Sequence, residues 1–84
     1  MSVVSAAVVD HVDYPGNDIA QTNRVNHNDC CADCATTPGC VVYVWTSWND
    51  GTCFLKSKAG QPTTYEGAKA AMQNRCHAPQ ANTD

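Results

Sequence analysis

Four of the six cysteines lie within one short stretch, DCCADCATTPGC, which runs from Asp29 to Cys40. The remaining two are Cys53 and Cys76. A chain of 84 residues buries too little apolar surface to be comfortably stable from its core alone. An even number of cysteines in so small a chain is typical of a disulfide framework, although the sequence leaves the pairing open.

Zinc binding and redox chemistry are the two alternatives to disulfides. Cys31 and Cys34 have the spacing of a zinc knuckle, but a structural zinc site needs a second close pair, and His77 has no matching partner. A thioredoxin-like redox centre places the same spacing after a parallel strand, and no such strand is indicated before Cys31. We therefore expect disulfides, with no metal and no cofactor.

Charge and hydropathy argue against several functional classes. The chain has 5 basic and 8 acidic residues, a formal net charge of −3, and its basic residues are scattered. Nucleic-acid grooves usually need a basic stripe, so no nucleic-acid partner is expected. No apolar run approaches the roughly 20 residues that span a bilayer, so no membrane insertion is expected. The start, MSVVSAAVVD, is too short and uncharged for a complete secretory signal, and we interpret it as the beginning of a mature chain.

A short helix is predicted over residues 27–35. Asn26 can cap it, Asp29 completes an approximate capping box, and the sequence TTPG at 36–39 ends it. Cys30 and Cys34 are four residues apart and share one helical face. Cys31 points about 100° away and needs a different partner.

Several strands are predicted around this helix. An edge strand is expected over residues 3–13, followed by a turn at YPGND, with Ile19 as an isolated anchor to the core. The segment CVVYVWTSW predicts a central strand, Asn49-Asp50-Gly51 a hairpin turn, and TCFLKS the return strand. By propensity alone, the segment YEGAKAAMQNR at 65–75 favours a helix.

Together these segments resemble the PAN/apple domain family, most closely the PAN modules of secreted oomycete and protist proteins. The likeness covers roughly residues 8–72 and is carried by GNDI at 16–19, VNHNDCCADCA at 25–35, PGCV at 38–41, YVW at 43–45 and GTCFLKS at 51–57.

The resemblance implies a small disulfide-rich α+β fold, in which a curved antiparallel sheet of about five strands has one helix packed across it. It places a closing strand at GAKAAM, against propensity. One domain over residues 1–84 is expected, with its core at about 8–76 and a flexible polar tail at 77–84. The family's usual bridge between the two termini is absent, because no cysteine precedes Cys30. The implied bridges are Cys30–Cys53 and Cys34–Cys40, and the two leftover cysteines are predicted to form Cys31–Cys76.

No catalytic constellation is evident. His11, His27 and His77 are scattered, the serines lack a G-x-S-x-G setting, and a nucleophilic cysteine is excluded if all six are bridged. We therefore expect that this chain is not an enzyme. The resemblance implies a secreted binding module, monomeric in isolation, for carbohydrate or for an extracellular protein. Its oomycete-like branch occurs in cellulose-attaching lectins and wall-associated elicitors.

Aromatic rings stack on the apolar faces of sugars, and polar side chains bind the hydroxyl groups. Trp48 is the strongest candidate, because it stands at the end of the central strand beside the turn. Tyr43 and Trp45, within that strand, are expected in the core, and Lys56 is expected to be structural. The candidate ligand-binding residues are Trp48, Asn49, Asp50, Tyr14 and Tyr65.

Three of these candidates also have a structural explanation. Tyr14 can plug the Pro-Gly turn, and turn chemistry accounts for Asn49 and Asp50. Three functions stay open: a carbohydrate-binding module, a protein-interaction module or effector recognised by a host protein, and a structural spacer. An exposed aromatic platform around Trp48 would favour the first, and a flat, mixed apolar patch would favour the second.

Overall fold

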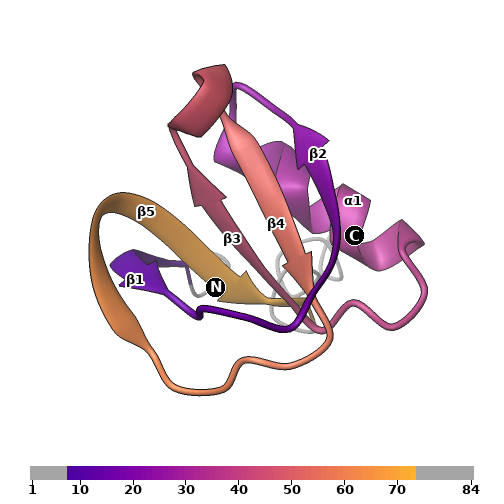
Figure 1. Ribbon diagram of the computed structural model, residues 1–84. Coiled ribbons are helices and arrows are strands. Elements are labelled where there is room, and N and C mark those ends of the chain that lie inside the picture. Colours follow the sequence, from indigo (N-terminus) through magenta and orange to yellow (C-terminus); the bar gives the residue numbers. More distant parts are fainter. Residues whose placement is uncertain (1–7, 74–84) are drawn as a thin grey trace, which may run out of the picture.

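The structure is a computed structural model and describes residues 8–73. Within this range one α-helix lies across a five-stranded antiparallel sheet with the strand order β1-β5-β3-β4-β2 (Figure 1). The predicted fold, a small disulfide-rich α+β domain with a curved antiparallel sheet, is confirmed. The elements in chain order are β1 (Val9–Asp13), β2 (Asp18–Asn23), the 3-10 turn η1 (His27–Asp29), α1 (Cys30–Thr36), β3 (Val42–Thr46), the 3-10 turn η2 (Trp48–Asp50), β4 (Thr52–Lys56) and β5 (Thr63–Met72).

The helical segment begins at the predicted cap. The side chain of Asn26 accepts a hydrogen bond from the backbone N–H of Asn28 at 2.9 Å, which opens η1, and α1 follows directly. Asp29 makes no side-chain capping hydrogen bond, so the predicted capping box is formed only in its Asn26 half. The helix ends at Thr36, and Gly39 then turns the chain with a positive φ of 88°.

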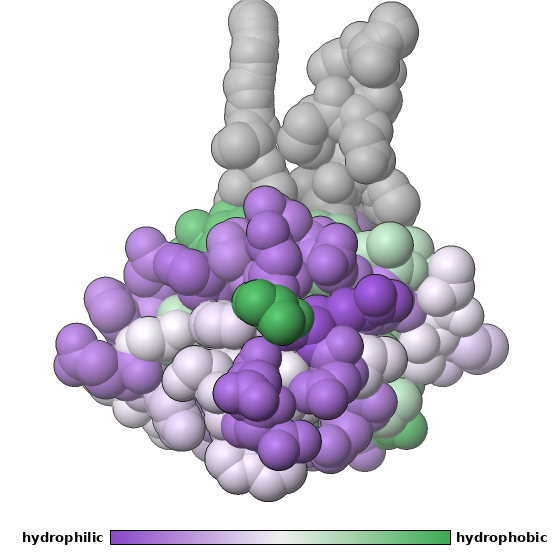
Figure 2. Space-filling model, turned by 90° about the horizontal axis from the view of Figure 1, so that it is seen from above, coloured by the Kyte–Doolittle hydropathy of each residue, from purple (hydrophilic) through white to green (hydrophobic). Residues whose placement is uncertain are grey.

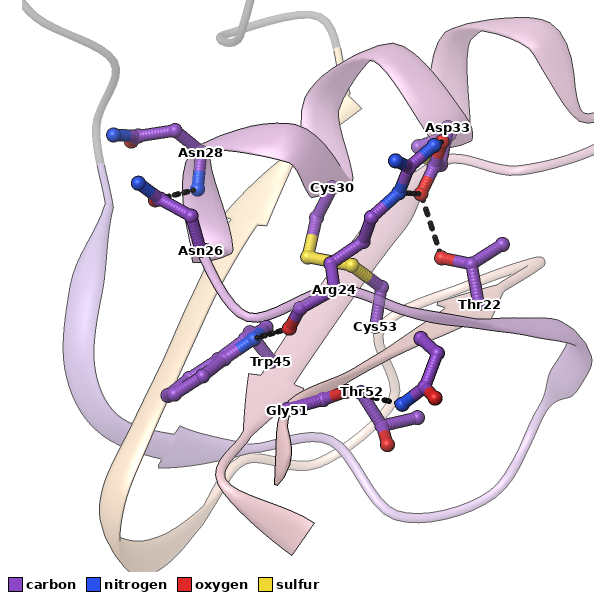
Figure 3. Close-up of a disulfide and its surroundings, with 12 residues drawn as sticks. Thr22, Arg24, Asn26, Asn28, Cys30, Asp33, Trp45, Gly51, Thr52 and Cys53 are labelled. Carbon is purple, nitrogen blue, oxygen red and sulfur yellow. Dashed lines mark hydrogen bonds and ion pairs between the residues drawn. A yellow bond between two sulfur atoms is a disulfide. The ribbon is translucent and has the colours of Figure 1, made fainter. Parts of the chain in front are cut away.

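Two disulfides tie α1 to the sheet. Cys30, at the start of α1, is bonded to Cys53 in β4 (Figure 3). One helical turn later, Cys34 is bonded to Cys40, which lies just before β3. Both pairings are those that the family resemblance implied. Cys30, Cys34 and Cys53 are almost completely buried, so the two bridges form part of the core between helix and sheet.

A forked ion pair on the same side of the sheet also connects the end of β2 to α1. Arg24 donates from Nε and Nη2 to the two carboxylate oxygens of Asp33 on α1, each at 2.8 Å, and Thr22 donates to the same carboxylate at 2.6 Å (Figure 3). The hydrogen bonds from Arg24 are the main reason that the pKa of Asp33 is lowered. The backbone carbonyl of Arg24 in turn accepts the indole N–H of Trp45 at 2.8 Å. The end of β2 is thereby joined to both α1 and β3.

The β3–β4 hairpin has the predicted turn. Asn49, Asp50 and Gly51 all have positive φ, at 55°, 67° and 112°, which these residue types tolerate best. Gly51 has a second requirement, because a Cβ there would lie 2.1 Å from the carbonyl oxygen of Arg24. That close approach is stabilised by a hydrogen bond from Arg24 N to Gly51 O at 3.0 Å.

The segment with helical propensity lies, as far as Met72, in the strand β5, as the family resemblance required. It pairs with β1 on one side and with β3 on the other. The two ladders pair residues 63–64 and 69–72, and tertiary pairing therefore overrides the helical preference of the alanines. Figure 1 shows β5 as a long, strongly curved strand. Gly67 lies within it with a φ of 86°.

Of the two edge strands, β1 was predicted from the sequence and β2 was not. The edge strand predicted over residues 3–13 is β1, and residues 1–7 lie outside the described range. The strand β2 was not predicted, because its sequence, DIAQTN, is mostly polar and lacks a clear alternation. The prediction that Ile19 anchors to the core is wrong. Ile19 is 44% exposed, since the neighbouring Ala20 and Thr22 contact the helical side of the sheet instead.

The sheet has an apolar cluster on each face. The predicted core residue Tyr43 is fully buried, whereas Trp45 is only half-buried at the margin of the same cluster. The cluster beneath α1 consists of Cys30, Cys34, Tyr43, Cys53, Leu55 and Ala71. The smaller cluster consists of Val44, Ala68 and Ala70, with Tyr14 packed against it.

Candidate functional site

An open pocket of about 380 Å³ lies on the face of the sheet away from α1. Three parts of the chain meet there: the β1–β2 connection, the β3–β4 hairpin and the first half of β5. We call it the hairpin pocket. Its lining residues are Asp13, Pro15, Gly16, Asp18, Thr46, Trp48, Phe54, Lys56 and Tyr65.

Strand alternation brings Phe54 and Lys56 to this pocket. Their neighbours Cys53 and Leu55 belong to the cluster beneath α1, and successive side chains of a strand point to opposite faces. The sequence TCFLK therefore serves the core with one set of side chains and the hairpin pocket with the other.

Trp48 is held by its backbone and presents its ring to solvent. Its N–H donates to the hydroxyl of Thr46 at 3.3 Å, and its carbonyl accepts from the hydroxyl of Thr52 at 2.9 Å. The residue is 56% exposed. Its ring lies against that of Phe54, with centroids 6.2 Å apart and planes tilted by 38°. Phe54 thus supports the Trp48 indole from one side, while about half of the residue stays exposed to solvent.

Lys56 carries a buried charge at the base of the pocket. It is only 3% exposed, and its ammonium donates to the carboxylate of Asp18 and to the carbonyl of Gly16 at 3.2 Å. The same nitrogen is 5.9 Å from the centre of the Phe54 ring. An ammonium has three N–H donors, so these two hydrogen bonds leave one donor for another acceptor.

The family model of the PAN domain matches residues 12–56, which is more than half of the chain. This range runs from β1 to the end of β4, and it contains both described disulfides and every pocket residue except Tyr65. The chain belongs to the PAN domain family. No curated protein matches it in sequence.

Membership in the PAN family carries a general function. PAN domains are binding modules for proteins or carbohydrates and are not known as enzymes. Disulfide-rich PAN domains are typical of extracellular proteins. The narrower likeness to secreted oomycete and protist modules stays a prediction.

The five predicted ligand-binding residues do not all meet in this PAN domain. Trp48 and Tyr65 line the hairpin pocket, and Tyr65 is 48% exposed. Asn49 and Asp50 form the hairpin turn, and Asp50 lines a separate hollow of about 110 Å³ with Asn23, Arg24 and Val25. Tyr14 is half-buried against the smaller apolar cluster, in line with the plug that its position suggested.

Sequence reasoning did not propose seven of the nine lining residues, among them Asp13, Asp18, Phe54 and Lys56. A signal for two of them was present, because Phe54 and Lys56 alternate with Cys53 along a strand whose cysteine was expected to bond to the helix. The expectation that Lys56 is structural agrees with its burial, yet Lys56 also lines the pocket. Asp18 had no local signal, since β2 was not predicted. Asp13 ends the predicted edge strand, but the sequence does not indicate which segments that strand end meets.

The end of the molecule that carries η2 has a mainly hydrophilic described surface, on which hydrophobic residues stand isolated (Figure 2). The flat, mixed apolar patch that would have favoured a protein partner is not seen from this end.

The bonding of Cys34 to Cys40 excludes a redox pair with Cys31. Cys31 is not a free thiol. Its predicted partner, Cys76, lies outside the described residues, so the third bridge stays a prediction.

Over residues 8–73, no three histidine, cysteine or acidic side chains gather as a metal site would require. In the same range, no helix has the length and hydrophobicity to cross a membrane.

Proposed function

We propose that this PAN domain is a non-catalytic carbohydrate-binding module of a secreted, wall-associated lectin, and that the hairpin pocket is its sugar site. One observation carries the proposal. Trp48 and Tyr65, from distant parts of the chain, line the same open pocket and are 56% and 48% exposed. Half-exposed aromatic rings on a rigid support are suited to stacking on the apolar face of a sugar ring.

Polar groups beside the rings support the same function. The unused N–H of Lys56 is a charge-assisted donor for a sugar hydroxyl. Asp18 holds Lys56 with one carboxylate oxygen, and its side chain is 47% exposed, which leaves the other oxygen to accept from a hydroxyl. A donor and an acceptor fixed to each other in this way match the paired hydroxyl groups of a sugar ring, because each hydroxyl can both donate and accept.

The aromatic rings and the ion pair would contribute to sugar binding in different ways. Stacking on Trp48 would supply most of the contact area, and the pair formed by Lys56 and Asp18 would select the orientation of the hydroxyls. The conformational entropy that the protein loses on binding would be small, because the backbone of Trp48 is already hydrogen-bonded to Thr46 and Thr52.

The test is depletion of the oxidised protein from solution by insoluble cellulose and chitin. We expect one or both polymers to deplete the native protein, and Trp48→Ala and Tyr65→Ala to abolish or strongly weaken that depletion. The matched control is Val25→Ala, which removes an 81% exposed apolar side chain outside the pocket and should leave depletion unchanged.

Failure of both polymers to deplete the protein would refute this choice of ligand and favour an extracellular protein partner, including a host protein that recognises an effector or elicitor. Equal loss of depletion in Val25→Ala would indicate general adhesion instead of a site. We expect the active species to be a monomer, which the mass of the protein in solution checks.

A further inference from the structure

The charge balance of the hairpin pocket narrows the class of sugar. Its charged lining residues are Asp13, Asp18 and Lys56, two carboxylates against one ammonium. Lys56 is buried and already paired with Asp18 and with a backbone carbonyl. The pocket therefore has a net charge of about −1, which comes from Asp13.

The Asp13 carboxylate has no cationic partner within the described part of the chain, where the ion pairs join Arg24 to Asp33, Lys56 to Asp18 and Lys69 to Asp10. Its backbone is nevertheless fixed. Asp13 ends β1, is paired with Thr63 of β5, and accepts a hydrogen bond from the Thr63 hydroxyl at 3.4 Å. Asp13 thus lines the pocket with a fixed backbone and a carboxylate that has no cationic partner among the described residues.

Carboxylates and aromatic faces together are the groups that bind an ammonium, through ion pairing and through the attraction of a cation to the ring face. The pocket contains both, in Asp13 and in the half-exposed rings of Trp48 and Tyr65. An acidic sugar would meet the opposite situation. Its carboxylate would be repelled by Asp13, and the one cation of the lining is already neutralised by Asp18.

We propose that the hairpin pocket takes an amine-bearing sugar residue, of the glucosamine type found in deacetylated chitin, in preference to its N-acetylated counterpart and to uronic acids. This inference rests on the proposed function, since it assumes that the pocket binds sugar. Asp13 is the specificity-determining residue: its carboxylate balances the protonated amine, and the aromatic rings contact the sugar face.

The test compares three soluble trisaccharides, of glucosamine, of N-acetylglucosamine and of galacturonic acid, by titration calorimetry. A mildly acidic buffer keeps the amine of the glucosamine trimer protonated. We expect the glucosamine trimer to bind about fivefold more tightly than the N-acetylated trimer, as one partly screened charge pair would give. The galacturonic acid trimer should bind most weakly.

Asp13→Asn keeps the shape of the side chain and removes its charge. We expect it to abolish the preference for the amine, so that the glucosamine trimer and the N-acetylated trimer bind with equal affinity. The matched control is Asp29→Asn, which removes an exposed carboxylate that makes no side-chain capping hydrogen bond and lies outside the pocket. Both variants remove one negative charge, so they alter the general attraction of a cation to the protein equally. Asp29→Asn should nevertheless retain the preference, because its charge lies outside the pocket.

The outcomes separate the inference from the proposed function. Trp48-dependent binding of the N-acetylated trimer without a preference for the amine would refute the inference and leave the proposed function intact. A preference that survives in Asp13→Asn, or that disappears equally in Asp29→Asn, would also refute it. Absence of binding by every trimer, together with no depletion by the polymers, would overturn both.

Discussion

The two faces of the sheet are built from the same strands and are stabilised in different ways. The face beneath α1 has two disulfides, a fully buried apolar cluster and a forked ion pair. The face that carries the hairpin pocket has half-exposed aromatic rings and an unpaired carboxylate. Cys53 and Phe54 are neighbours in β4, yet one is bonded to the helix and the other supports Trp48.

This difference shows how so small a domain can leave a surface open for binding. Covalent bridges concentrate stability on one face, and the other face is then free to expose groups that contribute little to folding. Substitutions beneath α1 should therefore lower stability, and substitutions in the hairpin pocket should change binding.

The largest effect is expected from the disulfides. Removal of the Cys30–Cys53 bridge by a double alanine variant should cost about 3.4 kcal/mol, and removal of Cys34–Cys40 about 2.2 kcal/mol, because the bridges close loops with sequence separations of 23 and 6 residues. Urea denaturation of both variants measures the difference. Equal costs would show that burial of the sulfur atoms, and not chain entropy, sets the contribution of each bridge.

A smaller effect is expected from the forked ion pair. Asp33→Asn should lower the melting temperature by about 6 °C at neutral pH. The pKa of Asp33 is lowered from 3.8, so its contribution to stability is fully present above pH 3.8 and is lost as the pH falls through the lowered pKa. The variant should therefore be less sensitive than the native protein to acid, as thermal unfolding at about pH 7 and about pH 3 would reveal. Parallel pH profiles would contradict a role for this carboxylate.

The ion pair at the base of the pocket should respond unequally to loss of its two members. Asp18→Asn leaves the buried ammonium of Lys56 without a countercharge and should lower the melting temperature by about 3 °C, a modest cost because Asp18 is 47% exposed. Lys56→Met replaces the ammonium by an apolar chain of similar length and should cost less. A greater loss in Lys56→Met would show that the bonds of Lys56 to Gly16 and Asp18 stabilise the turn more than their charge suggests.

The smallest effect on stability is expected from Trp48. Trp48→Ala should shift the melting temperature by less than about 2 °C, because the ring is 56% exposed and its backbone bonds to Thr46 and Thr52 remain. Differential scanning calorimetry of the same samples used for polymer depletion gives the comparison. A large loss of stability would make Trp48 a packing residue and would end the contrast between the two faces.

Much of the fold was predictable, because its signals are local. The Asn26 cap, the end of α1 at TTPG and the turn at Asn49-Asp50-Gly51 each depend on the conformational preferences of a few adjacent residues. The disulfide pairing was available only through the family resemblance. The strand β2 was missed, because a polar edge strand has little periodicity to detect.

The candidate site was only partly predictable. Trp48 was identified from its place beside a turn and Tyr65 only as an aromatic residue, but nothing in their sequence neighbourhoods indicated that they share a pocket. Asn49 and Asp50 satisfy the turn, and they do not line the pocket with Trp48. Asp13 and Lys56 take part in the pocket only because β1 and β4 bring them to it.

The sequence by itself determined the need for disulfides, the capped helix and the hairpin, since each depends on composition or on contacts between near neighbours. Only the tertiary structure decided that GAKAAM is a strand, because its two ladders lie far away in the chain. It also decided the pocket, which forms where the β1–β2 connection, the hairpin and β5 meet. Local preferences of about 1 kcal/mol yield to such long-range pairing, and for this reason the site became visible only in the folded protein.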